Sequence, residues 1–228
     1  MDSNISHAPL VLTIDGPAGA GKSTIAKLVA KRLGLPYLDT GAIYRAISWW
    51  MNSKEISYKD ESSVEGEMRG LKISLSDTSV FVNGTDVTCE IRTPDIDAIV
   101  SYYAAIKPVR DALLSLQREQ AASGLVADGR DMGTVVFPDA ELKIFLTASS
   151  EERAKRRYKE RLERGETADY DDILKQVNER DMYDINREIS PLRPALGSVI
   201  LDSTSMSIDE VVDAISSLAE QYGAQTAR

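Results

Sequence analysis

A glycine-rich run, residues 16–23, carries the clearest chemical signal in the sequence. Glycines at its first and sixth positions are followed by Lys22 and Ser23, which is the spacing of a loop that binds nucleoside triphosphates. Such glycines let backbone N–H groups surround a phosphate, the lysine reaches the β- and γ-phosphates, and the serine hydroxyl suits Mg²⁺. We therefore predict a nucleoside triphosphate site with Ser23 facing the metal; its residues are Gly16, Pro17, Ala18, Gly19, Ala20, Gly21, Lys22, Ser23 and Thr24.

A loop of this kind must lie between a strand and a helix, because the helix N-terminus adds partial positive charge at the phosphate. Residues 10–14 are apolar, rich in β-branched side chains and do not alternate with polar residues, as expected for a strand buried on both faces. The pattern after the loop predicts a helix that ends at Gly34. Its buried face should be formed by Ile25, Leu28, Val29 and Leu33.

The rest of the chain alternates short apolar runs with helical patterns. Further strands are predicted at 36–38, 125–127, 142–146 and 199–201, and helices at about 42–51, from Thr93, at about 108–122, after Ser149, at about 171–187 and after Ser207. Serine followed by glutamate three residues later predicts capping boxes at Ser149 and Ser207. The alternation predicts an α/β fold in which helices flank a five-stranded parallel sheet.

Residues from about 54 to 92 have a different texture. Leu71, Ile73 and Leu75 alternate with polar residues, and Asn83-Gly84 separates two β-rich runs, as in a tight hairpin. This predicts a small antiparallel sheet inserted into the parallel architecture. The expected organisation is one domain over 1–228, with a core of about 9–53, 93–150 and 188–223, the insert at about 54–92 and a helical lid at about 151–187.

Composition excludes several classes of protein. The chain has 228 residues, a formal charge of −9, one histidine and one cysteine. An acidic balance disfavours a general nucleic-acid binder, one cysteine cannot close an internal disulfide, and one histidine rules out a His-pair metal site. No apolar run approaches the ~20 residues of a membrane helix, and Met1–Pro9 resembles a short leader without the features of a signal peptide. A cytoplasmic protein with no membrane and no nucleic-acid partner is expected.

The remaining candidates are small kinases. The sequence lacks the Asn-Lys-x-Asp stretch that reads guanine, and it is short for a motor ATPase. A basic segment, residues 151–164, is a candidate lid that closes over substrates. An acceptor that is itself a phosphate needs no general base, which agrees with the shortage of histidine. Arginines suited to such an acceptor lie near predicted strand ends, where ligands bind open α/β sheets; they are Arg45, Arg110, Arg130, Arg180 and Arg187.

Over nearly all of its length, the chain resembles the bacterial cytidylate kinases. The resemblance rests on residues 14–23, 38–45, 90–93, 128–140 and 201–204. The longest of these segments reads Asp-Gly-Arg-Asp-Met-Gly-Thr-Val-Val-Phe-Pro-Asp-Ala. The resemblance implies a P-loop nucleoside monophosphate kinase core, transfer of the γ-phosphate of ATP to CMP or dCMP, Mg²⁺ as cofactor, and a monomer.

Individual roles follow from the same resemblance. Lys22, Arg130, Arg157 and Arg187 would be catalytic, with Arg157 approaching the transferring phosphoryl group from the lid. The acceptor phosphate would be bound by Thr40, Arg45, Arg130 and Arg187, cytosine by Ser101, Arg110 and Asp131, and ribose by Arg180 and Asp184, while Tyr44 either lines the acceptor site or only packs. An acidic group can accept from the N4 amino group of cytosine and an arginine can donate to N3 or O2, whereas uracil spoils both contacts.

Several interpretations stay open. Thr40 stands where serine is common in the family, and Ser23 stands where some members have glycine, but both supply a hydroxyl. Asp15 and Asp128 either orient water around magnesium or cap turns, with the first role favoured for Asp128. Two alternative functions are a related small P-loop kinase that acts on UMP, shikimate or dephospho-coenzyme A, and a nucleotide-binding regulator without transferase activity.

Overall fold

The computed structural model of the chain describes residues 10–76 and 79–226. The predicted leader, Met1–Pro9, lies outside the described residues. The chain divides into two units. The first contains the residues up to Leu38, Arg118–Asn186 and the residues from Ser190 onward, and the second contains Asp39–Gln117 and Arg187–Ile189. The second unit therefore holds the predicted insert together with the helices that precede and follow it in sequence.

The first unit is built on a five-stranded parallel sheet. In spatial order the strands are β2 (Tyr37–Asp39), β6 (Leu125–Gly129), β1 (Val11–Asp15), β7 (Leu142–Thr147) and β8 (Val199–Asp202). In the central strand, Ile14 lies opposite Asp128 of β6 and Ile144 of β7. Leu12 and Ile14 are fully buried. The predicted parallel sheet, with a first strand covered on both faces, is confirmed.

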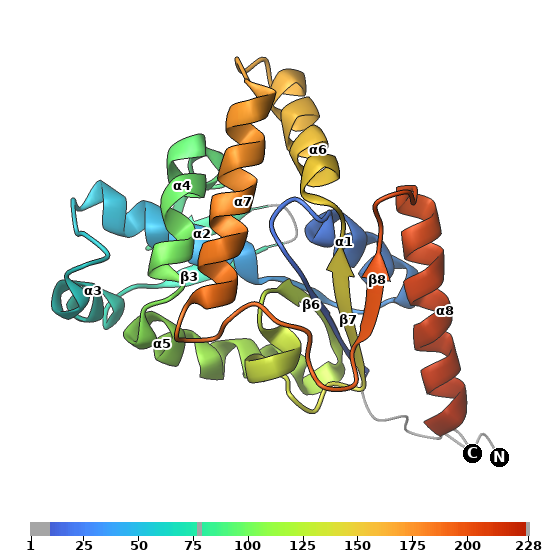
Figure 1. The fold of residues 1–228 in the computed structure, drawn as a ribbon. Helices are drawn as coiled ribbons and strands as arrows, with labels where there is room; N and C mark the ends of the chain where they lie inside the picture. The colour runs from blue at the N-terminus through green and yellow to red at the C-terminus, as the bar shows by residue number, and fades with distance from the viewer. Residues whose placement is uncertain (1–9, 77–78, 227–228) are drawn as a thin grey trace. The chain divides into compact units, whose positions relative to one another are not determined.

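Two helices pack together against this sheet. α1 (Lys22–Leu33) contacts α8 (Ile208–Thr226), and Figure 1 shows α8 running beside β8. Gly34 ends α1 in the left-handed conformation, as predicted. The prediction that Leu28 belongs to the buried face is wrong, because this side chain is 39% exposed. Ala26 and Ala30 are buried instead. The buried face of α1 is therefore formed partly by alanines, which are too small to mark that face clearly in the sequence.

The two predicted capping boxes have different outcomes. At α8 the box is complete, with the Glu210 N–H donating to Ser207 Oγ at 3.3 Å and the Ser207 N–H donating to the Glu210 carboxylate at 2.8 Å. At α6 (Ser150–Glu163) Ser149 Oγ accepts from the Glu152 N–H at 3.2 Å. The Ser149 N–H, however, donates to Thr204 Oγ1 at 2.9 Å. The second box is therefore half formed, because a residue distant in sequence takes the reciprocal bond.

The region predicted as a lid consists of two helices. α6 and α7 (Tyr170–Asn186) lie side by side, as Figure 1 shows, and contact each other along their length. Ala154, Ile173 and Val177 form a small apolar cluster between them. This cluster is separate from the core of the sheet, so the helix pair has packing of its own.

The second unit combines helices with a small antiparallel sheet. Its elements are α2 (Thr40–Ser53), α3 (Glu61–Met68), β3 (Ile73–Leu75), β4 (Val80–Val82), β5 (Thr85–Asp86), the short 3₁₀ turn η1 (Glu90–Arg92), α4 (Pro94–Tyr103) and α5 (Lys107–Glu119). The predicted hairpin is confirmed, since β4 pairs with β5 and both Asn83 and Gly84 have positive φ. Helix α3 was not predicted, because Val64 is its one fully buried residue and one apolar residue gives no periodic signal.

The core of the second unit lies between α2 and the small sheet. Buried Ala42 and Ala46 of α2 pack with Val80 and Val82 of β4. The indole N–H of Trp50 donates to the Glu67 carboxylate at 3.0 Å and thereby links α2 to α3. These contacts give the inserted sheet a helical support that its own short strands could not provide.

The longest described helices are α7 and α8. α7 has 17 residues and α8 has 19, and each has acidic residues in its first turn. Of the helices within residues 10–76 and 79–226, none is both long enough and apolar enough to cross a membrane.

Gly16 is the glycine whose replacement should damage this fold most. A Cβ added there would lie 1.9 Å from the carbonyl oxygen of Leu146 in β7, whereas a Cβ added at Gly34 would meet nothing within 4 Å. We expect Gly16→Ala to lower the free energy of unfolding by more than about 3 kcal/mol and Gly34→Ala by about 1 kcal/mol, the cost of a left-handed alanine. Urea unfolding followed by circular dichroism measures both. Equal losses in the two variants would contradict the importance of this close approach.

Candidate functional site

The phosphate loop, residues 16–23, joins the end of β1 to the start of α1. Gly19 and Gly21 have φ of 77° and 84°, a region that residues with a Cβ rarely adopt. Gly21 is also the N-cap of α1, so the positive end of that helix faces the loop. The Nζ of Lys22 donates to the carbonyl oxygen of Pro17 at 2.8 Å. The strand, loop and helix context expected of a nucleotide site is therefore present.

Ser23 is tied to the neighbouring strand β6. Its hydroxyl donates to Oδ2 of Asp128 at 2.9 Å, and Oδ1 of the same carboxylate accepts from the hydroxyl of Tyr37 at 2.7 Å. A hydroxyl beside a carboxylate offers the oxygen ligands that Mg²⁺ takes directly or through water. Within the described part of the chain, no cluster of three His, Cys, Asp or Glu side chains could hold a metal ion. A divalent cation bound beside Ser23 would take its remaining oxygen ligands from phosphates and water.

Positive charge is concentrated beside the loop. Lys22 is 6% exposed, and burial is the main reason why its pKa is lowered. Arg130 and Arg180 lower the pKa of Lys22 further by repulsion, while Asp128 and Asp15 act in the opposite direction. A polyanion bound here would relieve the repulsion between the three cations and would favour the charged form of the lysine.

Three residues predicted to contact the acceptor lie together in the first unit. Nε of Arg130, which follows β6, is 3.0 Å from Oδ2 of Asp184 on α7. Asp184 is 1% exposed. Arg180 lies one turn earlier on α7 and close enough to Lys22 to affect its pKa. The structure thus brings the predicted ribose-contacting residues of α7 next to the predicted phosphate-binding arginine of β6.

Arg153 supports the phosphate loop from α6, a role that the sequence pattern did not indicate. Its Nη1 donates to the carbonyl oxygen of Ala18 at 3.0 Å, and its Nη2 lies 2.6 Å from the carboxylate of Asp181 on α7. A Cβ added at Gly19 would lie 3.1 Å from the Cβ of Arg153. Arg153 therefore packs against the loop and connects it with both helices of the predicted lid.

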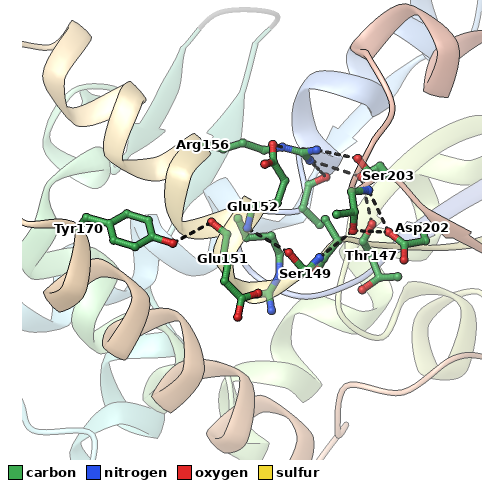
Figure 2. Close-up of polar contacts among 12 residues, drawn as sticks. Thr147, Ser149, Glu151, Glu152, Arg156, Tyr170, Asp202 and Ser203 are labelled. Carbon is green, nitrogen blue, oxygen red and sulfur yellow. Dashed lines mark hydrogen bonds and ion pairs between the residues drawn. The ribbon is translucent and has the colours of Figure 1, made fainter.

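Arg156 makes a second connection on the same helix face. It donates to the carbonyl oxygen of Ala20 at 3.4 Å and to that of Ser203 at 2.8 Å, and Figure 2 shows the guanidinium reaching Ser203 beside Asp202. Arg157, the predicted lid arginine, follows it and is half-buried. Spacing of three and four residues places Arg156 and Arg157 on the face of Arg153. This spacing could have indicated from the sequence that the three arginines share a face. Because most residues of α6 are charged, the spacing did not distinguish them from the others.

Asp15, at the end of β1, caps a turn. Its Oδ1 accepts from the N–H of Met132 at 2.8 Å, and its Oδ2 accepts from the N–H of Gly133 at 2.7 Å. These amides open a single π-helical turn, η3 (Met132–Val136), which no sequence periodicity indicated. Asp131, the predicted cytosine reader, directly precedes this turn and is 2% exposed. Of the two roles considered for Asp15, the geometry therefore shows turn capping.

Six of the predicted acceptor residues lie in the second unit. They are Thr40, Tyr44, Arg45, Ser101, Arg110 and Arg187. All but the half-buried Arg45 are buried. Thr40 opens α2, and Arg187 belongs to the second unit although it follows α7 directly in the chain. The predicted acceptor residues are thus divided between the units, with Arg130, Asp131, Arg180 and Asp184 in the first.

Within the second unit, the predicted residues are held by specific contacts. The guanidinium of Arg110 lies 5.5 Å from the centre of the Tyr44 ring, and its Nη1 donates to the carbonyl oxygen of Ala104 at 2.9 Å. Arg45 of α2 forms an ion pair with Asp97 of α4. These contacts hold the side chains of Arg45 on α2 and Arg110 on α5 in place.

Comparisons of the sequence with known proteins indicate one family. The sequence profile described as cytidylate kinase matches residues 12–221. The chain is 47% identical to the cytidylate kinase of Lactiplantibacillus plantarum over 222 residues, 95% of this chain and 97% of that one. It is 48% identical to the cytidylate kinase of Desulfitobacterium hafniense over 213 residues, 92% of each chain. The solved structure of an uncharacterized protein from Eubacterium ventriosum matches 93% of this chain and 98% of its own at a TM-score of 0.51 and 12% identity, which is a likeness of fold alone.

Asp15 should make stability depend on pH. Burial raises its pKa from 3.8 to about 7, although its bonds to the two backbone N–H groups oppose the rise. The folded chain then binds this proton more tightly than the unfolded chain between about pH 4 and pH 7, so the contribution of Asp15 to the free energy of unfolding falls as pH rises through that window. A shift of this size corresponds to at most about 4 kcal/mol.

Urea unfolding across this range tests the expectation. The difference in unfolding free energy between wild type and Asp15→Asn should decrease as pH rises, since the asparagine does not titrate. Asp139→Asn, at an exposed position, is the matched control and should leave the pH profile unchanged. A wild-type profile parallel to that of Asp15→Asn would show that the carboxyl of Asp15 keeps an ordinary pKa.

Proposed function

The chain belongs to the cytidylate kinase family, and we propose how its residues divide the work of phosphate transfer. It is a nucleoside monophosphate kinase that transfers the γ-phosphate of ATP to CMP or dCMP. The observation that carries the assignment of its site is the group of three cations, Lys22, Arg130 and Arg180, beside the loop at the end of β1. Such a group suits the negative charge of bound phosphates.

The donor site is formed by residues 16–24. Backbone N–H groups of the loop and the N-terminus of α1 bind the phosphates of ATP, and Lys22 stabilises charge on the β- and γ-phosphates. The support comes from the two positive-φ glycines and from the buried lysine side chain that folds back over the loop. Arg153 and Arg156 support the loop by binding its outward carbonyl groups, which leaves the opposite side of these peptides directed at the nucleotide.

Mg²⁺ is the proposed cofactor, with Ser23 as its protein ligand and Asp128 as the residue that orients it. When bound, the ion neutralises charge on the β- and γ-phosphates. The Ser23 hydroxyl is already held by the Asp128 carboxylate, which the Tyr37 hydroxyl holds in turn. The protein therefore presents its metal ligand in a fixed orientation.

The acceptor phosphate is bound by Thr40, Arg45, Arg130 and Arg187. Guanidinium groups match the geometry of phosphate oxygens and stay charged at every physiological pH. The phosphate of CMP is an oxyanion and attacks without a general base, so catalysis consists of alignment and charge neutralisation. Arg157 contributes from the lid, residues 151–187, which closes over the nucleotides while the core and the insert of residues 54–92 bind them.

Cytosine is read by Ser101, Arg110 and Asp131, while Arg180 and Asp184 contact the ribose and Tyr44 lines the acceptor site. Asp131 accepts from the N4 amino group, and Arg110 donates to N3 or O2. Uracil carries a carbonyl in place of the amino group and a proton on N3, so it leaves both protein groups mispaired. We further propose that the protein acts as a monomer in the cytoplasm.

A change at Asp131 should separate acceptor recognition from donor binding. Asp131→Ala should lower kcat/KM for CMP by the equivalent of about 2–5 kcal/mol, because a buried recognition contact is left unpaired, while the KM for ATP changes little. Coupled assay of ADP release with CMP, dCMP, UMP and AMP measures this. Lys22→Ala, in contrast, should impair turnover with every acceptor.

Asp139→Ala is the matched control for Asp131→Ala, because Asp139 is an exposed aspartate in the same segment. Its kinetics should equal those of wild type. If Asp131→Ala raised the KM for ATP as much as the KM for CMP, the assignment to the acceptor would be wrong. A wild-type preference for UMP or AMP would overturn the cytosine-reading assignment itself.

Removing the Ser23 hydroxyl should change the metal requirement. Ser23→Ala should need a higher Mg²⁺ concentration for half-maximal activity, by about tenfold, which is the lower range for loss of an ordered metal contact. Titration of activity with Mg²⁺ at saturating ATP and CMP measures the shift. Ser53→Ala, an exposed serine on α2, serves as control. An unchanged Mg²⁺ requirement in Ser23→Ala would exclude Ser23 as the ligand.

A further inference from the structure

The turn between β6 and η3 carries two residues with proposed roles, Arg130 and Asp131. Such a turn must be held rigidly, because a displacement of about 1 Å at a recognition group is enough to weaken binding strongly. Two contacts hold it from β1. Both oxygens of the Asp15 carboxylate accept backbone N–H groups from the first two residues of η3, directly after the turn, with Met132 at 2.8 Å and Gly133 at 2.7 Å.

This arrangement differs from an ordinary helix start. The first N–H groups of a helical turn lack partners within the turn, and an aspartate at the N-cap usually accepts from them with its own side chain. Asp131 stands at that position, but within the described residues its side chain makes no capping bond to η3. Asp15 supplies the cap from another strand. The cap of η3 is therefore provided by Asp15 and not by Asp131.

Gly133 makes the close approach possible. A Cβ at this position would lie 3.0 Å from Oγ1 of Thr13, 3.2 Å from the Cβ of Ala195 and 3.4 Å from Oδ2 of Asp15. Thr13 and Asp15 are both residues of β1, so a larger residue would push the turn away from that strand. Gly133 thus leaves room for β1 to approach, and the Asp15 carboxylate binds the backbone N–H groups of Met132 and Gly133.

We propose that Asp15 is a positioning residue for acceptor specificity, which fixes the Arg130–Asp131 turn at the depth where Asp131 distinguishes cytosine from uracil. The proposal rests on the acceptor role proposed above for Asp131. Asp15 also directly precedes Gly16 of the phosphate loop. Asp15 is therefore the last residue of the strand that leads into the donor loop, and it also holds the turn that carries Asp131.

Asp15→Asn tests the proposal, because the amide replaces one carboxylate oxygen with an NH₂ group, which cannot accept the N–H that this oxygen binds. At about pH 8, where the wild-type carboxyl is ionised, we expect the ratio of kcat/KM for CMP to that for UMP to fall about tenfold or more. The KM for CMP should rise, while the KM for ATP should stay within about threefold of wild type. Amide hydrogen exchange at Met132 and Gly133 should become faster.

Gly133→Ala disturbs the same contact from the other side and keeps the proposal testable if Asp15→Asn does not fold. It should reduce discrimination between CMP and UMP in the same direction, with the same acceleration of exchange at Met132. Asp139→Asn is the control, with kinetics and exchange equal to those of wild type. Asp131→Asn is the reference, and it should lose discrimination at least as strongly as Asp15→Asn.

The pattern across variants separates two kinds of failure. If Asp131→Asn loses discrimination while folded Asp15→Asn or Gly133→Ala keeps the wild-type ratio, the positioning role of Asp15 is overturned and the role of Asp131 stands. If Asp131→Asn itself keeps the wild-type ratio, the proposed reader is wrong and the positioning role falls with it. Loss of affinity for ATP equal to that for CMP in Asp15→Asn would also overturn the proposal, since it would place the effect in the donor loop.

Discussion

Buried positive charge is the constraint on which the arrangement of the first unit depends. Lys22 is almost fully buried and lies within the electrostatic influence of Arg130 and Arg180. Removing such charges from water costs several kcal/mol per ion unless partners compensate. Compensation comes from carboxylates on separate elements: Asp128 of β6 acts on Lys22, and Asp184 of α7 pairs with Arg130. The chain as a whole is acidic, with a net charge of −9, although these three cations lie close to one another.

The parallel sheet explains why these groups meet. Parallel strands bring their carboxyl ends to one edge, and ligands of open α/β folds bind there. β1 ends at Asp15 and β6 at Gly129, side by side in register, so the phosphate loop and the Arg130–Asp131 turn begin next to each other. α6 and α7 then supply arginines and carboxylates from a helix pair with its own small apolar cluster. Side chains of β1 and α6 also bind backbone groups of η3 and of the phosphate loop, which ties these segments to neighbouring elements.

The elements that could be predicted from the sequence are those determined by residues close together in the chain. The five strands, the loop between β1 and α1, the hairpin at Asn83-Gly84 and the helix start at Thr93 all follow from turn chemistry, caps and apolar runs, and all are confirmed. What the sequence did not predict depends on partners far along the chain. Leu28 is exposed because alanines fill the core side of α1, and the bonds of Asp15 to the turn at Met132 join positions that no pattern relates.

For the site, the limit of sequence reasoning was similar. Residues of the phosphate loop could be named from spacing alone, and the proposed acceptor residues came from a family resemblance that the comparisons bear out at the level of the family. Their individual roles remain predictions. Arg153 and Arg156 were visible only as members of a charged helix, yet each binds a carbonyl group of the loop. A charge pattern gives the number of arginines on a helix, whereas the fold decides which of them are turned inward.

The position of β1 in the sheet also has a consequence for how the chain folds. This strand is synthesised well before its partners, Leu125–Gly129 and Leu142–Thr147. Most of the second unit, Asp39–Gln117, lies between them in sequence. At about 5–20 residues per second, the phosphate loop must wait several seconds before a strand exists on either side of it. Contacts of such long range slow folding. The residues of the phosphate loop are therefore synthesised before their strand partners and are ordered only after Asp39–Gln117 has been synthesised.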